Sequence, residues 1–143
     1  MNVHQISVFL ENRAGQLAEI AAVLAENHVD LRAISIAETA DYGVLRMIVE
    51  DAEKATAILR DHGYIFSMTP VTVIAVPDQP GALSLVLTLL AQAQIDIEYM
   101  YSLFTHMDGK AYMVFRISDE EKFIAKLAEH GVHAVSKEEL GLK

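Results

Sequence analysis

The chain contains an internal repeat, and this repeat constrains its fold more than any other feature of the sequence. Matching residues recur 66 positions apart in the first part of each copy, and 68 positions apart after an insertion of two residues. The matching pairs include Asn12 with Asp78, Gly15 with Gly81, Leu24 with Leu90, Gly43 with Gly109, Asp51 with Asp119 and Gly63 with Gly131. Because the matches keep their order along nearly the whole chain, the sequence predicts two copies of one folding unit.

The boundary between the copies is expected near Thr69 and Pro70. All three prolines of the chain lie between Pro70 and Pro80, at the start of the second copy. We therefore expect one domain over residues 1–69 and a second over residues 70–143. A unit of about 70 residues buries only ~60% of the surface of its unfolded chain when it folds alone. We therefore expect the units to pack against each other or against a second chain, which favours a homodimer.

Each copy predicts the same order of elements, which is strand, helix, strand, strand, helix and strand. Apolar and β-branched runs mark the strands, and apolar residues at helical spacing mark the helices. The expected strands cover residues 3–10, 31–38, 44–49 and 64–68 in the first copy and residues 71–76, 97–105, 111–117 and 132–135 in the second. With right-handed crossovers, this order predicts an α+β fold of two ferredoxin-like βαββαβ sandwiches in tandem, each an antiparallel sheet with both helices on one face.

The second helix of each copy is expected over residues 51–62 and 119–130. Ser118, with Glu121 three residues on, is typical of a capping box at the start of the later helix. Each helix ends in a histidine, His62 or His130, followed by a glycine that suits a left-handed stop. We interpret these histidines as groups that meet the negative end of the helix. The six histidines include no pair at the i, i+4 spacing of helical metal ligands, so no metal site is expected.

The first helix of the second copy is expected to be apolar nearly all round. Its main apolar face is formed by Leu83, Val86, Leu87 and Leu90. Leu85 and Leu89 are expected to add apolar side chains on the far side. A helix of this kind is buried on two sides or lies in an interface.

Charge and composition exclude several classes of protein. The formal net charge is −9, from 11 basic and 20 acidic residues spread evenly along the chain, and this disfavours nucleic-acid binding. The absence of cysteine excludes disulfides, thiolate zinc sites, iron–sulfur clusters and cysteine nucleophiles. The start of the chain lacks the pattern of a signal peptide, and the longest mostly apolar run, residues 81–91, is too short to span a bilayer. We therefore expect a cytoplasmic protein without a membrane partner.

No sequence motif of a familiar catalytic or cofactor site is present. The chain has no GxSxG, GxxxxGKS/T, GxGxxG or HExxH pattern. We therefore expect a protein that is not an enzyme and carries no cofactor. The alternative interpretation is a small isomerase or lyase on a ferredoxin-like sandwich, with His106 and Tyr101 as acid–base groups.

The loop between the first strand and the first helix has the same pattern in both copies. Asn12-Arg13-Ala14-Gly15 and Asp78-Gln79-Pro80-Gly81 each place a short polar side chain three residues before a glycine. The N–H groups at a helix start lack backbone acceptors and can bind a carboxylate, and glycine lets a ligand approach the backbone closely. Asn12 or Asp78 would then bind the α-ammonium group of a free amino acid. The alternative interpretation is that these two side chains only cap the helix.

Two segments carry a longer pattern of strand, N/D-x-x-G turn, leucine-rich helix and a (V/I)D(L/I) entry into the second strand. They are VFLENRAGQLAEIAAVLAENHVDLRAIS and VIAVPDQPGALSLVLTLLAQAQIDIEYMYS. In this pattern both copies resemble ACT domains, small regulatory modules that bind amino acids and are appended to many biosynthetic enzymes. The chain is similar over nearly its whole length to stand-alone tandem ACT proteins. It departs from the family at Ala14, where the second copy has Pro80, the commoner residue, so we expect the two sites to differ in affinity.

The resemblance implies a ligand site between ACT units, where the turn of one unit faces the second strand of its neighbour. The residues carried over from the first copy are Asn12, Arg13, Ala14, Gly15, Gln16 and Leu17 of the turn, with Ile34, Ser35 and Ile36 of the strand. Those carried over from the second copy are Asp78, Gln79, Pro80, Gly81, Ala82 and Leu83 of the turn, with Met100, Tyr101 and Ser102 of the strand. Tyr99 and Tyr101 are expected on one side of their strand, either as ligand contacts or as core or interface aromatics.

The function that the resemblance implies is regulatory. The protein would bind a free amino acid and pass that state to its own oligomer or to an enzyme of amino-acid metabolism. The alternative is an assembly module, in which the apolar helix of the second copy docks to another protein and no ligand binds.

Overall fold

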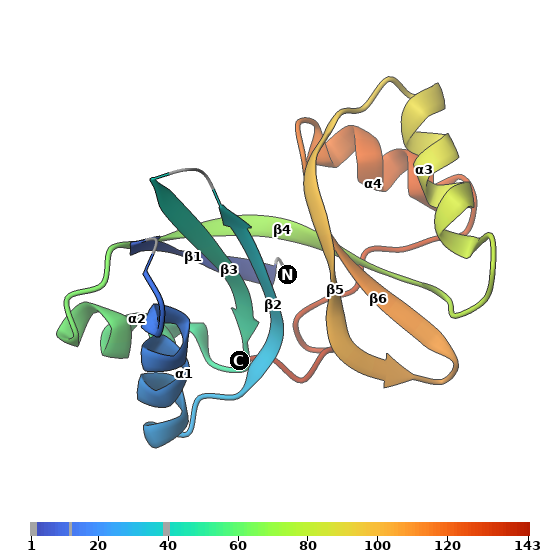
Figure 1. Ribbon diagram of the computed structural model, residues 1–143. Helices are drawn as coiled ribbons and strands as arrows, with labels where there is room; N and C mark the ends of the chain where they lie inside the picture. The colour runs from blue at the N-terminus through green and yellow to red at the C-terminus, as the bar shows by residue number, and fades with distance from the viewer. Residues whose placement is uncertain (1–2, 12, 39–40) are drawn as a thin grey trace. The chain divides into compact units, whose positions relative to one another are not determined.

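The computed structural model describes residues 3–11, 13–38 and 41–143, apart from the side chains of residues 38, 105 and 106 (Figure 1). Its elements in chain order are β1 (Val3–Glu11), α1 (Gln16–Glu26), β2 (Leu31–Glu38), β3 (Tyr42–Val49), α2 (Ala52–Asp61), β4 (Phe66–Pro77), α3 (Ala82–Gln92), β5 (Ile97–Met107), β6 (Lys110–Ile117) and α4 (Glu120–Ala128). The hydrogen-bonded strand order is β2-β3-β1-β4-β6-β5. These elements confirm the predicted α+β fold of two ferredoxin-like units.

The chain divides into two compact units at the repeat boundary. The N-terminal unit holds His4–Thr69 together with Gly141–Lys143 from the end of the chain. The C-terminal unit holds Pro70–Leu140 together with Val3. The N–H group of the last residue donates to the carbonyl oxygen of Glu50 at 2.8 Å, which fixes the chain end in the N-terminal unit. Each end of the chain therefore belongs to the unit formed mainly by the other copy.

In the N-terminal unit, β2, β3, β1 and the start of β4 pair in that order, and α1 and α2 pack against one core. Alternation along β1 places Ile6, Val8 and Leu10 in this core. Ile20 and Leu24 of α1 fill the same core because they lie one helical turn apart. The loop from β1 to α1 therefore leaves the core beside Leu10 and carries the first glycine turn.

In the C-terminal unit, β4, β6 and β5 form an antiparallel sheet. Phe115 of β6 and Phe123 of α4 are buried and meet with their ring centroids 5.4 Å apart. The fourth strand expected over residues 132–135 is reduced to one bridge, in which Ala134 faces Ile74. The prediction of a full strand was wrong because the segment is short and a turn over residues 137–141 follows it almost at once.

The strand β4 is continuous where the sequence predicted two strands and a link. Proline lacks an N–H group, but its φ suits extended backbone, and it biases the preceding residue toward an extended conformation as well. Thr69 and Pro70 therefore continue the strand and do not turn it. Phe66 packs against the core of the N-terminal unit, and Ile74 and Val76 lie in the core of the C-terminal unit. One strand thus serves both units.

The histidines at the ends of α2 and α4 confirm their predicted role. Nδ1 of His62 lies 2.9 Å from the carbonyl oxygen of Ile58, and Nδ1 of His130 lies 3.2 Å from that of Lys126. A carbonyl oxygen accepts, so Nδ1 carries the hydrogen in each ring. Each histidine thus satisfies a carbonyl group that the end of the helix leaves without a partner.

The start of α4 corrects the predicted capping box. The N-cap residue is Asp119, whose Oδ1 accepts from the N–H of Lys122 at 3.0 Å. Asp51 caps α2 in the same way, accepting from the N–H of Lys54 at 3.1 Å. Ser118 is not the cap because it lies one residue earlier, where its N–H donates to the carbonyl oxygen of Asp96.

The helix α3 buries more of its circumference than predicted. Leu89 is only 4% exposed and belongs to the core, together with Val86 and Leu90. The prediction that it lies on the far side was wrong because it follows Val86 by three residues, which places both on one face. Leu85, which is 54% exposed, is the side chain that remains on the surface. No helix among the described residues is long and apolar enough to cross a membrane.

Candidate functional site

The two glycine turns have the same backbone conformation. Gly15 has φ 87° and ψ −10°, and Gly81 has φ 89° and ψ −14°. Each is the N-cap residue of the helix that follows, so glycine holds this position and not the polar residue three places earlier. An added Cβ would meet no atom within 4 Å at either glycine. Glycine is therefore required here by the left-handed backbone and not by contact with another part of the chain.

The first turn is fastened by its own side chains. Gln16 is buried, and its Oε1 accepts from the N–H of Glu11 at 2.5 Å. The N–H of Arg13 donates to the carbonyl oxygen of Glu11 at 2.9 Å. Ala14 is exposed, and Asn12 lies outside the described residues. Of the predicted site residues in this turn, Gln16 thus has a structural bond that the sequence did not reveal.

Four side chains beside the first turn form a charged cluster, defined by Glu11, Arg13, Glu19 and Tyr64. The guanidinium of Arg13 lies 3.2 Å from Oε2 of Glu11 and 3.0 Å from Oε2 of Glu19. The hydroxyl of Tyr64 donates to Oε1 of Glu19 at 3.2 Å. The hydrogen bonds to Glu19 and then to Glu11 raise the pKa of Arg13, and burial followed by the bond to Glu19 raises the pKa of Tyr64.

A small hollow of about 140 Å³ adjoins the first turn. It brings three predicted turn residues, Arg13, Gln16 and Leu17, together with Ile36 of β2. The structure thus places a predicted turn residue and a predicted strand residue around one space within a single unit. Ile34 instead packs against the core, and Ser35 pairs with Arg46 of β3 in the sheet. Leu10, Glu11 and Gly43 complete the lining and were not predicted.

Backbone hydrogen bonds fasten the second turn. The N–H of Asp78 donates to the carbonyl oxygen of Gly109 in the β5–β6 turn at 2.8 Å. The N–H of Gln79 donates to Pro77 at 2.9 Å, and that of Ala82 donates to Gln79 at 3.3 Å. The first turn of α3 follows directly, and N–H groups in a first helical turn lack intrahelical acceptors.

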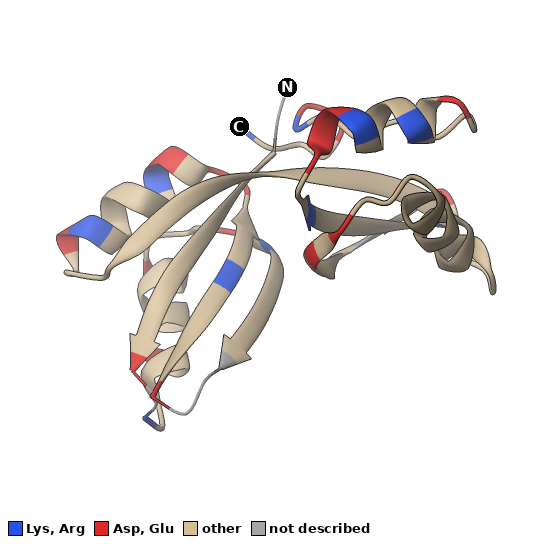
Figure 2. Ribbon diagram, turned by 90° about the horizontal axis from the view of Figure 1, so that it is seen from above, with Lys and Arg blue, Asp and Glu red and all other residues tan. Residues whose placement is uncertain are grey.

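A larger space, which we call the apolar hollow, adjoins the second turn. It has a volume of about 340 Å³. Its lining is Ala75, Val76, Pro77, Gln79, Pro80, Gly81, Ala82, Leu85, Val86 and Val132. Gln79 is the one polar side chain among them. The helix α3 has no charged residue along its length, whereas α2 and α4 carry both signs of charge (Figure 2). The hollow is therefore uncharged on every described side.

The predicted residues of β5 do not reach the apolar hollow. Leu83 and Met100 pack against the core of the C-terminal unit. The rings of Tyr99 and Tyr101 stack with centroids 6.5 Å apart and an interplanar angle of 17°, so they lie on one side of the strand as predicted. Ser102 is exposed. Val132, which follows α4, takes the place beside the second turn.

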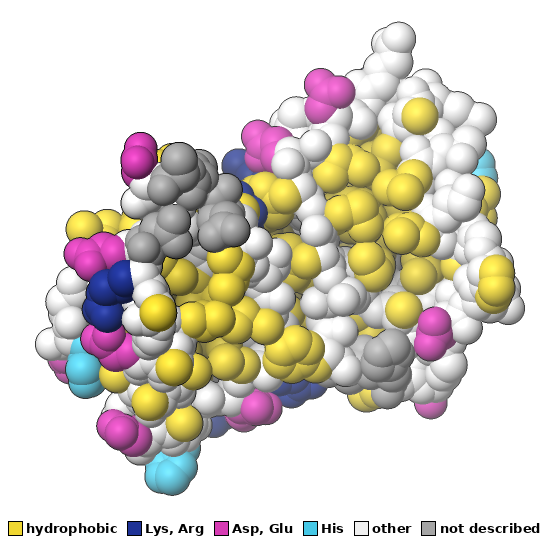
Figure 3. All heavy atoms as spheres, viewed as in Figure 1, with side chains coloured by type: hydrophobic (Ala, Val, Ile, Leu, Met, Phe, Trp, Pro, Cys, Tyr) yellow, Lys and Arg dark blue, Asp and Glu magenta, His cyan; other side chains and the backbone are white. Residues whose placement is uncertain are grey.

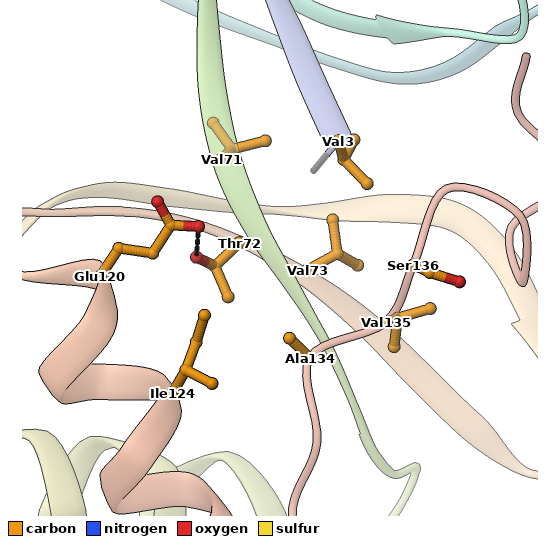
Figure 4. Close-up of a pocket in the computed structure, with 9 residues that line it drawn as sticks. All are labelled: Val3, Val71, Thr72, Val73, Glu120, Ile124, Ala134, Val135 and Ser136. Carbon is orange, nitrogen blue, oxygen red and sulfur yellow. Dashed lines mark hydrogen bonds between the residues drawn. The ribbon is translucent and has the colours of Figure 1, made fainter. Parts of the chain in front are cut away.

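A third hollow, of about 190 Å³, lies in the C-terminal unit beside the reduced fourth strand (Figure 4). Most of its lining is valine and alanine. Oγ1 of the buried Thr72 donates to Oε1 of Glu120 at 3.1 Å, so these two polar groups bond to each other. No predicted site residue lines this hollow.

The structure bears on the metal site and on the acid–base pair considered from the sequence. No group of three or more His, Asp or Glu side chains within the described ranges is placed to hold a metal. Of the acid–base pair in the alternative interpretation, Tyr101 stacks on Tyr99, and the side chain of His106 lies outside the described part of the chain.

The sequence missed the residues that distinguish the two turns. Glu19 and Tyr64 in the first copy align with Leu85 and Val132 in the second, at offsets of 66 and 68. The signal was present in the repeat itself, because aligning the copies residue by residue shows a charged set opposite an apolar one. Only the fold shows that these distant residues share one surface beside the glycine.

Known proteins match the chain in sequence and in fold. The family described as an ACT domain pair matches residues 1–142. A protein from Bacteroides thetaiotaomicron of known crystal structure is 40% identical, with a TM-score of 0.88 over 99% of this chain and 96% of that chain. The ligand-free regulatory subunit of aspartate kinase from Thermus thermophilus is 14% identical and similar in fold, with a TM-score of 0.64 over 90% of this chain and 91% of its own. The curated proteins contain no match. The chain therefore belongs to the ACT domain pair family.

Proposed function

We propose that this protein is a non-catalytic regulator that binds a free amino acid at a glycine turn. The observation that carries the proposal is the recurrence of one unusual local structure at matching positions of the two copies. Gly15 and Gly81 both start a helix from a left-handed backbone, and each adjoins a hollow. A helix start of this kind, kept at two matching places, leaves the first N–H groups of each helix open to a ligand and lets the ligand approach the backbone closely.

The chemistry of the turn suits a zwitterion. A carboxylate is stabilised by the N–H groups of the first helical turn and by the positive end of the helix. An α-ammonium group needs an acceptor close by, and Asp78 supplies an exposed carboxylate three residues before Gly81. The two charges of an amino acid are therefore matched by groups on both sides of one glycine.

Fold relatives support a regulatory role. The similar structure from Thermus thermophilus is a regulatory subunit of aspartate kinase, a catalyst of amino-acid metabolism by its name. We infer that the present protein passes its bound state to a partner enzyme of amino-acid metabolism. Regulation of this kind requires a coupling free energy of ~1–3 kcal/mol, which changes the affinity for the partner about 5- to 150-fold.

We also infer that two copies of the chain associate. β2 pairs with β3 and β5 pairs with β6, and no described strand pairs with the second edge of either. Ile36 on β2 is 48% exposed and Phe104 on β5 is 56% exposed. Apolar side chains gather over these strands in Figure 3. An open apolar edge is a surface that another strand can extend, so light scattering should give twice the mass of the chain.

A panel of the twenty amino acids, each at millimolar concentration, tests the proposal by thermal unfolding. A ligand at 100 times its Kd stabilises a protein by ~2.7 kcal/mol, which moves Tm by several degrees. Asp78→Ala should reduce the shift, because it removes the acceptor for the ammonium group. Asp61→Asn, which removes an equal charge from exposed α2, should leave the shift unchanged. A panel without any shift refutes amino-acid binding and favours the assembly module.

A further inference from the structure

The two copies differ in charge at one place beside the glycine turn. In the N-terminal unit this place holds the charged cluster, whose side chains bond to one another. The residues at the matching positions of the C-terminal unit are Pro77, Gln79, Leu85 and Val132. None of the four carries a charge, and all four line the apolar hollow. The matching place thus holds bonded charged side chains beside a hollow of about 140 Å³ in one unit, and an uncharged hollow of about 340 Å³ in the other.

The side chains themselves explain this difference. Arg13 reaches both Glu11 and Glu19, and Tyr64 reaches Glu19 from the far side, so four long side chains span the space. In the C-terminal unit, Leu85 is too short and apolar to bond to Gln79, and Val132 has no hydroxyl. The side chains therefore leave the space unspanned, and it has a volume of about 340 Å³.

The size and lining of the apolar hollow define what it can accept. Sites for small molecules have volumes of ~300–1,000 Å³, and the hollow lies at the lower end of this range. A charged group placed there would lose its water without gaining a partner. Each methylene group that moves from water into such a lining strengthens binding about four-fold. The hollow therefore selects a small apolar group.

We propose that the amino acid bound at the Gly81 turn has an apolar side chain, which enters the apolar hollow between Pro77, Leu85 and Val132. This inference rests on the proposed function, because it names the ligand class for the same turn. The turn and the hollow are one continuous surface, since Gln79 and Gly81 line the hollow as well. The N-terminal turn does not take such a ligand, because the charged cluster occupies the matching place.

Calorimetric titration of the full chain with leucine, lysine and aspartate tests the ligand class. Leucine should bind with a Kd at least about ten-fold lower than either charged amino acid, with one site per chain. The double variant Gln79→Arg with Leu85→Glu transfers the charged pair of the first copy into the hollow. It should weaken leucine binding at least about ten-fold. Ser84→Glu is the matched control for the single variant Leu85→Glu, since it adds the same negative charge to an exposed position of α3 outside the lining, and it should leave leucine binding unchanged.

Each other outcome overturns a defined part of the reasoning. Tighter binding of lysine or aspartate than of leucine refutes the apolar ligand class but leaves amino-acid binding intact. Leucine binding that survives the double variant, in a chain whose circular dichroism matches the wild type, refutes the hollow as the place of the side chain. The single variant Leu85→Glu gives the same test if the double variant does not fold. No binding of any of the twenty amino acids refutes the proposed function itself.

Discussion

Replacing Gly81 with alanine should destabilise the protein through its backbone alone. The glycine has φ 89°, and an L-residue in the left-handed region costs roughly 1–2 kcal/mol. No steric cost adds to this, because a Cβ at this position meets nothing within 4 Å. The expected loss is therefore about 1–2 kcal/mol in the free energy of unfolding, or about 2–8 °C in Tm for a chain of this size.

Urea unfolding followed by far-UV circular dichroism measures this loss, with the slope against urea expected to stay constant. Gly81→Asn is the informative control, because asparagine adopts the left-handed region more readily than alanine. The asparagine variant should therefore be more stable than the alanine variant, although its side chain is larger. Gly15→Ala should cost as much as Gly81→Ala, since φ is 87° there. An alanine variant as stable as the wild type, or an asparagine variant less stable than alanine, refutes backbone strain as the reason for glycine.

Three further predictions concern stability. Asp119→Ala should lower the free energy of unfolding by ~1 kcal/mol, because it removes the cap on the N–H of Lys122. Asp119→Asn should lower it less, because asparagine is also a good cap. Equal losses for the two variants in urea unfolding would contradict the cap. Phe123→Ala should cost ~3–5 kcal/mol, because the ring is 1% exposed and packs on Phe115, whereas a loss below that of a surface substitution would contradict this packing. The raised pKa of Tyr64 means that the unfolded state loses its proton first, so stability should fall as pH rises through 10 toward the folded pKa. Tyr64→Phe should flatten that fall in urea unfolding between pH 9 and 11, and an identical slope in both proteins would refute the assignment.

The repeat made the fold predictable, because each helix or strand could be predicted from two independent stretches of sequence. Alternation in β1 and helical spacing in α1 marked the buried faces without any knowledge of the partner elements. The errors lie where local signals conflict with neighbours in space. Pro70 is a turn signal in sequence, but its extended backbone fits a strand that has partners on both units. Ser118 and Asp119 are both good caps, and the bond of Ser118 to Asp96 decides between them.

The candidate site was only half predictable for a related reason. The N/D-x-x-G pattern locates both glycine turns, because a left-handed helix start requires glycine at a fixed place. It does not reveal that Gln16 folds back onto Glu11, since a buried glutamine in sequence looks like a surface one. It also does not reveal that Val132 lies beside Leu85, since these residues are brought together only when α4 packs next to α3.

The continuous strand β4 limits how many residues can be inserted at the boundary between the copies. Phe66 packs against one core and Ile74 lies in the other, and the two residues are eight positions apart, an even number. Side chains in a strand alternate between faces, so an insertion of one residue between them would turn every later side chain of the strand to the wrong face. An insertion of two would preserve both cores. Evolution can therefore vary which residues stand at this boundary freely, but it can vary their number only in steps of two.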